Sequence, residues 1–454
     1  MDSTRREGIF PMAGSVAERE IERMMTLHPK GFDLSLGRIT RLLKRLGNPQ
    51  DRLPPVIHVA GTNGKGSTAA FSRALLEAAG LQVHVHTSPH LVNWHERYRL
   101  AAPGGGRIVA DDVLADAIIR VGKANDGEAI TVFEILTATT FVLFSEHPAD
   151  AAIIEVGLGG RFDATNVIAR PASTVIMPVS LDHEAFLGDR VELIAAEKAG
   201  IIKRGVPVIV GAQESELARE VIIETAARVG APALVYGQAF MAHGENGRLI
   251  YQDEDGLMDL TPPRLPGRHQ FANAAAAIAT VKAAGFHIGP AEADRAMQTV
   301  EWPGRMQRLA TGKLVALAPK GSEIWLDGGH NPGAGVVISE ALAEQEERFS
   351  RPLFMICGMI STKDQTNFFR AFEGMVKHVF TVPVSMSEAG VPNGELAARA
   401  MDAGLSAEPV ASVDAALMIL RDSWEPGETP PRILIGGSLY LAGEVLKLNG
   451  TPPV

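Results

Sequence analysis

Strand-like and helix-like segments alternate along this chain, and no other feature of the sequence limits its fold as strongly. Short apolar runs predict buried strands at 56–60, 81–86, 150–156, 173–179 and 206–211. Longer segments with a helical pattern separate these runs. Repeated strand–helix–strand units form a parallel sheet that is covered by helices on both faces. The first half of the chain is therefore predicted to be a doubly wound α/β domain.

The alternation stops over residues 231–262, where turn signals replace helical patterns. Asn246-Gly247 and Asp255-Gly256 separate short strand-like runs, and such dipeptides are typical of hairpin turns. We predict a small antiparallel β insertion here, followed by a helix over roughly 268–284.

A second α/β unit is predicted after Pro303. The chain has 454 residues, which is more than one hydrophobic core usually supports. We therefore divide it into residues 1–303 and a smaller domain of residues 304–454. In the second domain we expect strands at 323–329, 353–359, 378–384 and 432–438, and helices at 334–347 and 413–423.

The acidic balance of the chain argues against a nucleic-acid partner. Its formal net charge is −10, whereas binding to a phosphate backbone needs clustered lysine and arginine. No segment approaches the roughly 20 consecutive apolar residues that span a bilayer, and the first residues lack a secretory signal pattern. The single cysteine, Cys357, lies in an apolar run and is predicted to be buried. We expect a cytoplasmic monomer.

The segment HVAGTNGKGSTAAF runs from a predicted strand through a glycine-rich turn into a predicted helix. Glycines let backbone N–H groups approach phosphate oxygens, and the positive end of the helix dipole favours an anion there. Lys65 adds a charge, and Ser67 or Thr68 can offer a hydroxyl to Mg²⁺. The predicted phosphate-binding residues are Gly61, Thr62, Asn63, Gly64, Lys65, Gly66, Ser67 and Thr68.

This loop departs from the general phosphate-loop pattern at two positions. Val59 stands where that pattern has glycine, and Gly66 stands where it has a hydroxyl residue. The alternative is a purely structural turn. Each glycine in this loop loses more backbone entropy on folding than another residue would. A ligand that requires the glycines explains why this cost is tolerated, so the nucleotide site is favoured.

The variant GTNGKGST resembles the Mur ligase superfamily, whose members use ATP to activate a carboxylate. Further segments resemble its folylpolyglutamate and dihydrofolate synthase family: TSPHL at 87–91, TVFEILTA at 131–138, EVGLGGRFDATN at 155–166, LDHEAFLG at 181–188, EKAGIIK at 197–203, HQFAN at 269–273, WPGRMQ at 302–307 and DGGHNPGA at 327–334. The resemblance implies a Mur-ligase-like ATPase domain followed by a Rossmann-like C-terminal domain.

The same resemblance implies a magnesium site. The family's metal ligands correspond to Ser88, Glu155 and His183, and Ser67 is expected to join them. Read alone, His183 is more often a hydrogen-bonded loop histidine. Lys198 read alone is a solvated lysine paired with an acid. The resemblance instead implies N6-carboxylysine at Lys198, which requires a neutral amine and would bind a second Mg²⁺.

The remaining site residues also follow from the resemblance. Arg305 lies near the predicted domain boundary, where an interdomain ion pair is the alternative role. The ATP site is extended by Asn273, Arg305, Asp327 and His330. The catalytic set is Lys65, Glu155, His183 and Lys198. The pteroate-binding set is Leu27, His28, Pro29, Lys30, Thr131, Val132, Phe133, Glu134, Phe162, Asp163 and Ala164, each of which, taken singly, is more often structural.

Three positions differ from the family's usual pattern. The family has threonine at Glu184, leucine at Phe162, and an Asp-Lys-Asp segment where this chain has Thr362-Lys363-Asp364. The first two lie beside the predicted metal and pteroate sites. We therefore expect them to shift the preference for substrates without abolishing the reaction.

The implied reaction joins L-glutamate to dihydropteroate, and to the γ-carboxylate of tetrahydrofolate or its one-carbon forms. ATP would supply an acyl phosphate, so no serine or cysteine nucleophile is needed. One rival is another amino-acid ligase of the Mur type, acting on a peptidoglycan precursor. A second rival is a nucleotide-binding module without turnover.

Overall fold

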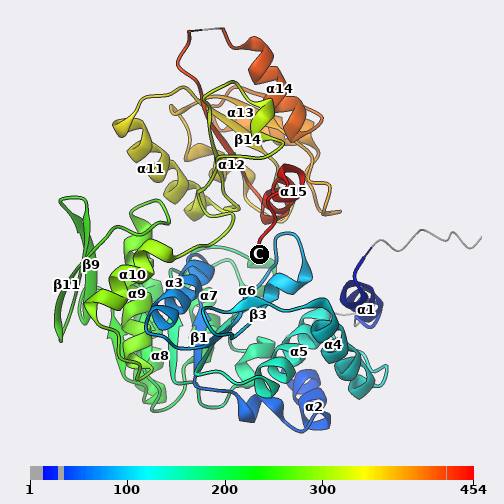
Figure 1. Ribbon diagram of the computed structural model, residues 1–454, viewed down its shortest axis with the longest axis vertical. Coiled ribbons are helices and arrows are strands. Elements are labelled where there is room, and N and C mark those ends of the chain that lie inside the picture. The colour runs from blue at the N-terminus through cyan, green and yellow to red at the C-terminus, as the bar shows by residue number, and fades with distance from the viewer. Residues whose placement is uncertain (1–13, 29–34, 426) are drawn as a thin grey trace, which may run out of the picture.

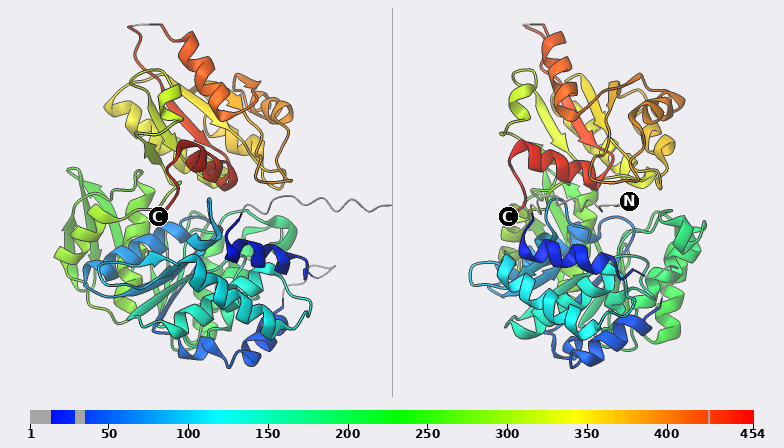
Figure 2. Two further views of the ribbon diagram at one scale, coloured as in Figure 1. Left: turned by 45° about the vertical axis from the view of Figure 1, so that its right-hand side comes forward. Right: turned by 90° about the vertical axis from the view of Figure 1, so that its right-hand side faces the viewer.

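The chain folds into two α/β bodies, one above the other, as Figure 1 and Figure 2 show. A computed structural model describes residues 14–28, 35–425 and 427–454. Three separate sheets organise these residues. The predicted α/β class and the two-part plan are confirmed.

The first sheet has eight strands in the order β4-β3-β2-β5-β1-β6-β7-β8. Neighbours from β2 to β8 pair in parallel, whereas β3 and β4 add an antiparallel edge that the sequence did not predict. All five predicted strands are present. The strands are β1 (Val56–Ala60), β2 (Val83–His86), β3 (Tyr98–Leu100), β4 (Arg107–Ile108), β5 (Ala151–Glu155), β6 (Ser173–Ile176), β7 (Val208–Val210) and β8 (Ala233–Val235).

Helices cover both faces of this sheet, because alternate strand residues point to opposite sides. In β5, Ile153 joins the core under α3, α9 and α10, while Ile154 joins the core under α1, α2, α4 and α5. On that second side, α7 and α8 cover β6 and β7. The helices are α1 (Val16–Met25), α2 (Gly37–Arg45), α3 (Lys65–Ala78), α4 (Asp111–Asn125), α5 (Val132–Glu146), α6 (Glu184–Leu187), α7 (Val191–Lys198), α8 (Glu216–Val229), α9 (His269–Ala283) and α10 (Pro290–Thr299).

The predicted antiparallel insertion is a three-stranded sheet that packs beside α9. It is shorter than predicted, because residues 233–235 of the range 231–262 form β8 of the parallel sheet. Asn246 and Gly247 both have positive φ, 50° and 75°, as a two-residue hairpin turn requires. The strands are β9 (Phe240–Glu245), β10 (Arg248–Asp253) and β11 (Gly256–Leu260). The predicted helix over 268–284 is α9.

The third sheet takes all its strands from residues after Pro303, in the order β12-β13-β17-β14-β15-β16. Only β12 is antiparallel to its neighbour. Its strands are β12 (Gln307–Leu309), β13 (Glu323–Leu326), β14 (Leu353–Cys357), β15 (Val376–Thr381), β16 (Ala407–Pro409) and β17 (Arg432–Gly436). Its helices are α11 (Pro332–Arg348), α12 (Gln365–Arg370), α13 (Asn393–Asp402), α14 (Val413–Ser423) and α15 (Leu439–Asn449).

The burial of the single cysteine and the character of the helices bear on two further expectations. Cys357 is fully buried in β14, as predicted. Among the described residues no helix combines the length and apolar character needed to cross a membrane. The division of the chain at Pro303 stays a prediction.

Candidate active site

A cavity of about 1000 Å³ lies between the two bodies, at the carboxyl ends of the first sheet's parallel strands. Ligands of open α/β sheets bind at this edge, because the loops that follow the strands converge there. Segments far apart in the sequence meet in it. The predicted residues that line it are Thr62, Asn63, Gly64, Lys65, Gly66, Ser67, Ser88, Glu155, His183, Asn273, Arg305, Asp327 and His330.

The phosphate loop connects β1 to α3 in a conformation that needs glycine. Gly61 and Gly64 have positive φ values of 145° and 82°, and a side chain at Gly64 would reach within 2.8 Å of Asn273 Oδ1. Lys65 Nζ donates to the carbonyls of Gly61 and Thr62 at 3.0 and 3.1 Å. Burial lowers the pKa of Lys65, although the Glu155 carboxylate opposes the shift. The Lys65 side chain therefore folds back onto the phosphate loop and hydrogen-bonds to its backbone.

The two hydroxyls that follow the loop have different surroundings. Ser67 lines the cavity. Thr68 is fully buried, lies outside the cavity lining, and its Oγ1 has no hydrogen-bond partner. Of the two hydroxyl candidates, the geometry favours Ser67 as the one that reaches a bound metal.

Ser88 and Glu155 meet at the base of the cavity. Glu155 Oε2 accepts a hydrogen bond from Ser88 N at 3.2 Å, while the buried Ser88 Oγ has no partner. Burial raises the pKa of the Glu155 carboxyl, a shift that the nearby Lys65 charge opposes. A hard cation would supply the missing partner for the hydroxyl and neutralise the carboxylate, so both oxygen donors fit Mg²⁺.

His183 lies on the loop after β6, with a positive φ of 54°. Its side chain is 46% exposed and faces the cavity. Partial burial lowers its pKa to about 4, so the ring is neutral and can ligate a metal at neutral pH. Within the described ranges, no three His, Cys, Asp or Glu side chains gather closely enough to hold a metal alone. The predicted set therefore depends on its serine oxygens.

Lys198, at the end of α7, is buried and donates from Nζ to the Gly61 carbonyl at 2.9 Å. Burial, reinforced by the positive charge of Lys65, lowers the pKa of Lys198 to about 7. No ion pair with an acid is formed by Lys198 in the part of the chain that the structure describes. The solvated, paired lysine that the helical pattern allowed is thus wrong, and the amine is one that carbamylation could use.

The second domain contributes Arg305, Asp327 and His330 to the same cavity. Asp327 accepts hydrogen bonds from Met306 N and Gly329 N at 2.7 and 2.6 Å, which fixes the backbone beside Arg305. Burial raises the pKa of Asp327 and lowers that of His330 to about 4. Arg305 forms no ion pair with any described residue, so its charge is available to an anionic ligand.

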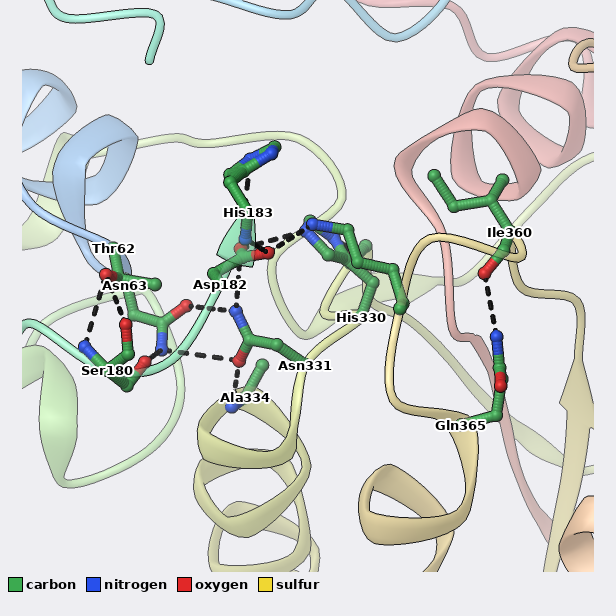
Figure 3. A network of polar contacts seen from close by, with 12 residues as sticks. Thr62, Asn63, Ser180, Asp182, His183, His330, Asn331, Ala334, Ile360 and Gln365 are labelled. Carbon is green, nitrogen blue, oxygen red and sulfur yellow. Dashed lines mark hydrogen bonds and ion pairs between the residues drawn. The ribbon is translucent and has the colours of Figure 1, made fainter. Parts of the chain in front are cut away.

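A polar network joins the two bodies across the cavity, as Figure 3 shows. Asn63 on the phosphate loop exchanges hydrogen bonds with Asn331, the N-cap of α11, at 3.4 and 3.1 Å. Asp182 pairs with Lys363 Nζ at 2.5 Å, and both side chains are nearly buried. Asp182 also accepts from Asn331 at 3.4 Å. The nucleotide loop is therefore bonded directly to the second domain.

None of the predicted pteroate residues that the structure describes lines the cavity. Leu27 O accepts from the N–H of Ile130, so the first two stretches adjoin, and the ring of Phe133 packs against Gly157 of the cavity wall. Pro29 and Lys30 fall outside the described residues. Phe162 is 41% exposed. Ala164 is buried, Thr131 and Val132 are half-buried, and His28 is exposed.

Two acidic members of that set already have internal partners. Glu134 closes a capping box with Thr131 and pairs with Arg38 at 2.9 Å, while its Oε1 is buried without a partner. Asp163 accepts from the backbone N–H of Gly157 and from three other donors. These contacts favour a structural role for Asp163 and leave one oxygen of Glu134 available.

Sequence reasoning missed three members of the interdomain network. Asp182 is next to the predicted ligand His183, and Lys363 is in the segment noted only as a departure from the family. Asn331 follows His330. The pairing of Asp182 with Lys363 is invisible in the sequence, because 181 positions separate them.

A phosphate loop that faces a second α/β domain across a cavity, with a buried carboxylate and a serine hydroxyl beside it, is the arrangement of an ATP-dependent ligase of the Mur type. Residues 59–281 match the model of the Mur ligase middle domain. The chain is 33% identical over 428 residues to folylpolyglutamate synthase of Lacticaseibacillus casei, covering 90% of this chain and 92% of that protein. It is 32% identical to dihydrofolate synthase/folylpolyglutamate synthase of Bacillus subtilis, covering 92% and 95%.

Solved structures of folylpolyglutamate/dihydrofolate synthases have the same fold as this chain. E. coli FolC in complex with DHPP and ADP superimposes with a TM-score of 0.83 at 27% identity, covering 96% of this chain and 98% of that one. A bifunctional synthase with Mn, AMPPNP and L-glutamate bound gives a TM-score of 0.81 at 27% identity, covering 96% and 98%. The chain belongs to the folylpolyglutamate/dihydrofolate synthase family. It is an ADP-forming, ATP-dependent glutamate ligase of folate metabolism.

Proposed function

We propose that this chain adds L-glutamate both to dihydropteroate and to the γ-carboxylate of reduced folates, in one active site. The observation that carries the proposal is the cavity in which the phosphate loop, the Ser88–Glu155 pair and Arg305 of the second domain meet. Relatives of similar identity are named for one activity or for both. One cavity that serves both acceptors fits the bifunctional names.

ATP and a divalent metal ion are the ligands that this cavity fits. We assign the metal to Ser88 and Glu155, with Ser67 and His183 completing the set. When bound, Mg²⁺ neutralises charge on the transferred phosphoryl group. We further propose that Lys198 is carbamylated and holds a second Mg²⁺. Its lowered pKa supports that modification, as does the lack of an ion pair between Lys198 and any described acid.

The proposed reaction has two steps, phosphoryl transfer and amide formation. The loop N–H groups, Lys65 and Arg305 hold the ATP phosphates while the acceptor carboxylate takes the γ-phosphoryl group, giving an acyl phosphate and ADP. The amine of L-glutamate then attacks the acyl carbon, phosphate leaves, and the amine loses a proton as the amide forms. The second domain excludes water, which would otherwise hydrolyse the acyl phosphate.

The acceptor enters from the side of the cavity where Phe133 packs on Gly157. We propose that the stretches around Leu27, Thr131 and Phe162 bind the pteroate portion. The unpartnered Glu134 Oε1 is the acceptor oxygen that supports this assignment. We also propose that the protein acts as a monomer and that the domain boundary lies at Pro303, after which the strands of the third sheet begin.

The test is phosphate release by purified protein with ATP, Mg²⁺ and L-glutamate, supplied with dihydropteroate, with tetrahydrofolate, or with neither. Release with both acceptors supports the bifunctional proposal. Release with one acceptor alone restricts the enzyme to that activity. Equal release with and without acceptors would contradict the proposal.

A further inference from the structure

An indole ring packs directly against the phosphate loop. An ideal Cβ on Gly66 would lie 2.5, 2.7 and 2.8 Å from Cζ2, Cε2 and Nε1 of Trp302. Real side chains do not approach so closely, so the ring occupies the space of any side chain at position 66. Both residues line the nucleotide cavity.

Space, and not backbone conformation, explains the glycine at this position. Gly61 and Gly64 have positive φ, which L side chains rarely adopt. Gly66 instead lies in the first turn of α3, where any residue can be helical. The general phosphate-loop pattern has serine or threonine here, and such a side chain would collide with the ring. The departure from the pattern is therefore explained by a residue 236 positions away.

Trp302 belongs to the segment that leads from α10 into the second domain. Its ring is half-buried and packs on the core shared by α3, α9 and α10. Three residues later Arg305 enters the cavity from the second-domain side. The same short segment thus contacts the loop that holds the phosphates and carries the arginine that faces them.

We propose that Trp302 is a positioning residue for ATP. Its ring holds the first turn of α3, and with it the N–H groups at the helix start, in the geometry that binds the phosphates. It also fixes the start of the segment that delivers Arg305. Trp302 touches the loop and not the reacting atoms, so its effect is on nucleotide affinity. The proposal depends on ATP binding and not on the identity of the folate acceptor.

The test is a double-mutant cycle between positions 66 and 302, read out as ADP binding by calorimetry and as KM and kcat for ATP. Trp302→Ala should raise the Kd for ADP and the KM for ATP about tenfold, with kcat changed less than about threefold. Gly66→Ala should weaken binding at least as much. Once the ring is gone, Gly66→Ala should cost nothing further, because the steric conflict is removed.

Two further variants keep the test decisive. Gly394→Ala is the matched control, since Gly394 is also near a helix start but has nothing within 4 Å of an added Cβ; it should leave ADP binding unchanged. If Trp302→Ala does not fold, Trp302→Phe provides the second background, because phenylalanine lacks the outer indole atoms. Equal weakening by Gly66→Ala with and without the ring would overturn the proposal. So would an unchanged affinity in Trp302→Ala protein that melts like the wild type.

Discussion

Breaking the ion pair between Asp182 and Lys363 should impair catalysis far more than breaking an exposed pair of equal length. The two side chains are 9% and 7% exposed, and their charged atoms are 2.5 Å apart. At an effective dielectric of about 20, two charges at that separation attract by about 7 kcal/mol. Removing both charges from water offsets most of that attraction. The pair as a whole contributes little, whereas a single remaining charge is costly.

Removing one partner of a fully buried pair costs about 3–5 kcal/mol. When Lys363 is replaced, Asp182 keeps a hydrogen bond from Asn331, so we take a value near the lower end of this range, about 2.7 kcal/mol, for either variant. Because the pair joins the two bodies across the nucleotide cavity, we expect this cost to fall on the arrangement that binds ATP, which corresponds to about 100-fold in kcat/KM. Asp182→Asn and Lys363→Met should each show this loss. The double variant should lose much less than either single variant, and not 10,000-fold, because neither charge is then stranded.

The assay is kcat/KM for ATP from phosphate release, with circular dichroism melting to show that each variant is folded. Glu216 and Arg219 on α8 form a surface pair with the same 2.5 Å separation. Glu216→Gln and Arg219→Met should each change kcat/KM less than about twofold, since exposed pairs contribute little. If the losses in Asp182→Asn and Lys363→Met multiply in the double variant, the two residues are not coupled and the reasoning is refuted.

Three further outcomes are expected. Ser67→Ala should lower kcat/KM for MgATP at least about tenfold, whereas Thr68→Val should leave it within about twofold, because the Thr68 hydroxyl is buried without a partner; equal losses in steady-state assays would contradict the choice of Ser67. Burial lowers the pKa of His58 to about 3, so from pH 6.5 downwards the unfolded chain binds a proton that the folded chain does not, costing about 2 kcal/mol of stability at pH 5. His58→Gln should therefore melt with a shallower acid dependence than the wild type, and an unchanged dependence would argue against the shift. Gly443→Ala would place a Cβ 1.9 Å from the Leu91 carbonyl and should destabilise by about 1–3 kcal/mol, seen as a lower melting temperature; an unchanged value would mean that the two segments separate readily.

Much of the site could be predicted locally. The phosphate loop lies within a few consecutive residues, so its strand, glycines and helix start are all visible in the sequence. Ser88 and His183 follow predicted strands, Glu155 lies at the end of one, and the resemblance to the family selected all three. The structure places all three in the nucleotide cavity, although their roles as ligands remain to be tested. The pteroate residues were harder to judge, because a buried carboxylate such as Asp163 looks the same in sequence whether a ligand or the backbone satisfies it.

The sequence by itself determined the α/β class, the parallel strands, the antiparallel insertion and the nucleotide loop, because each depends on periodicity or on contiguous residues. Tertiary structure alone decided which side chains meet across the two bodies. The contact of Trp302 with Gly66 and the pair of Asp182 with Lys363 join residues that no local pattern connects. Burial, too, is a property of the folded chain. Lys198 has an ordinary sequence environment, and its lowered pKa arises only because the fold removes it from water beside Lys65.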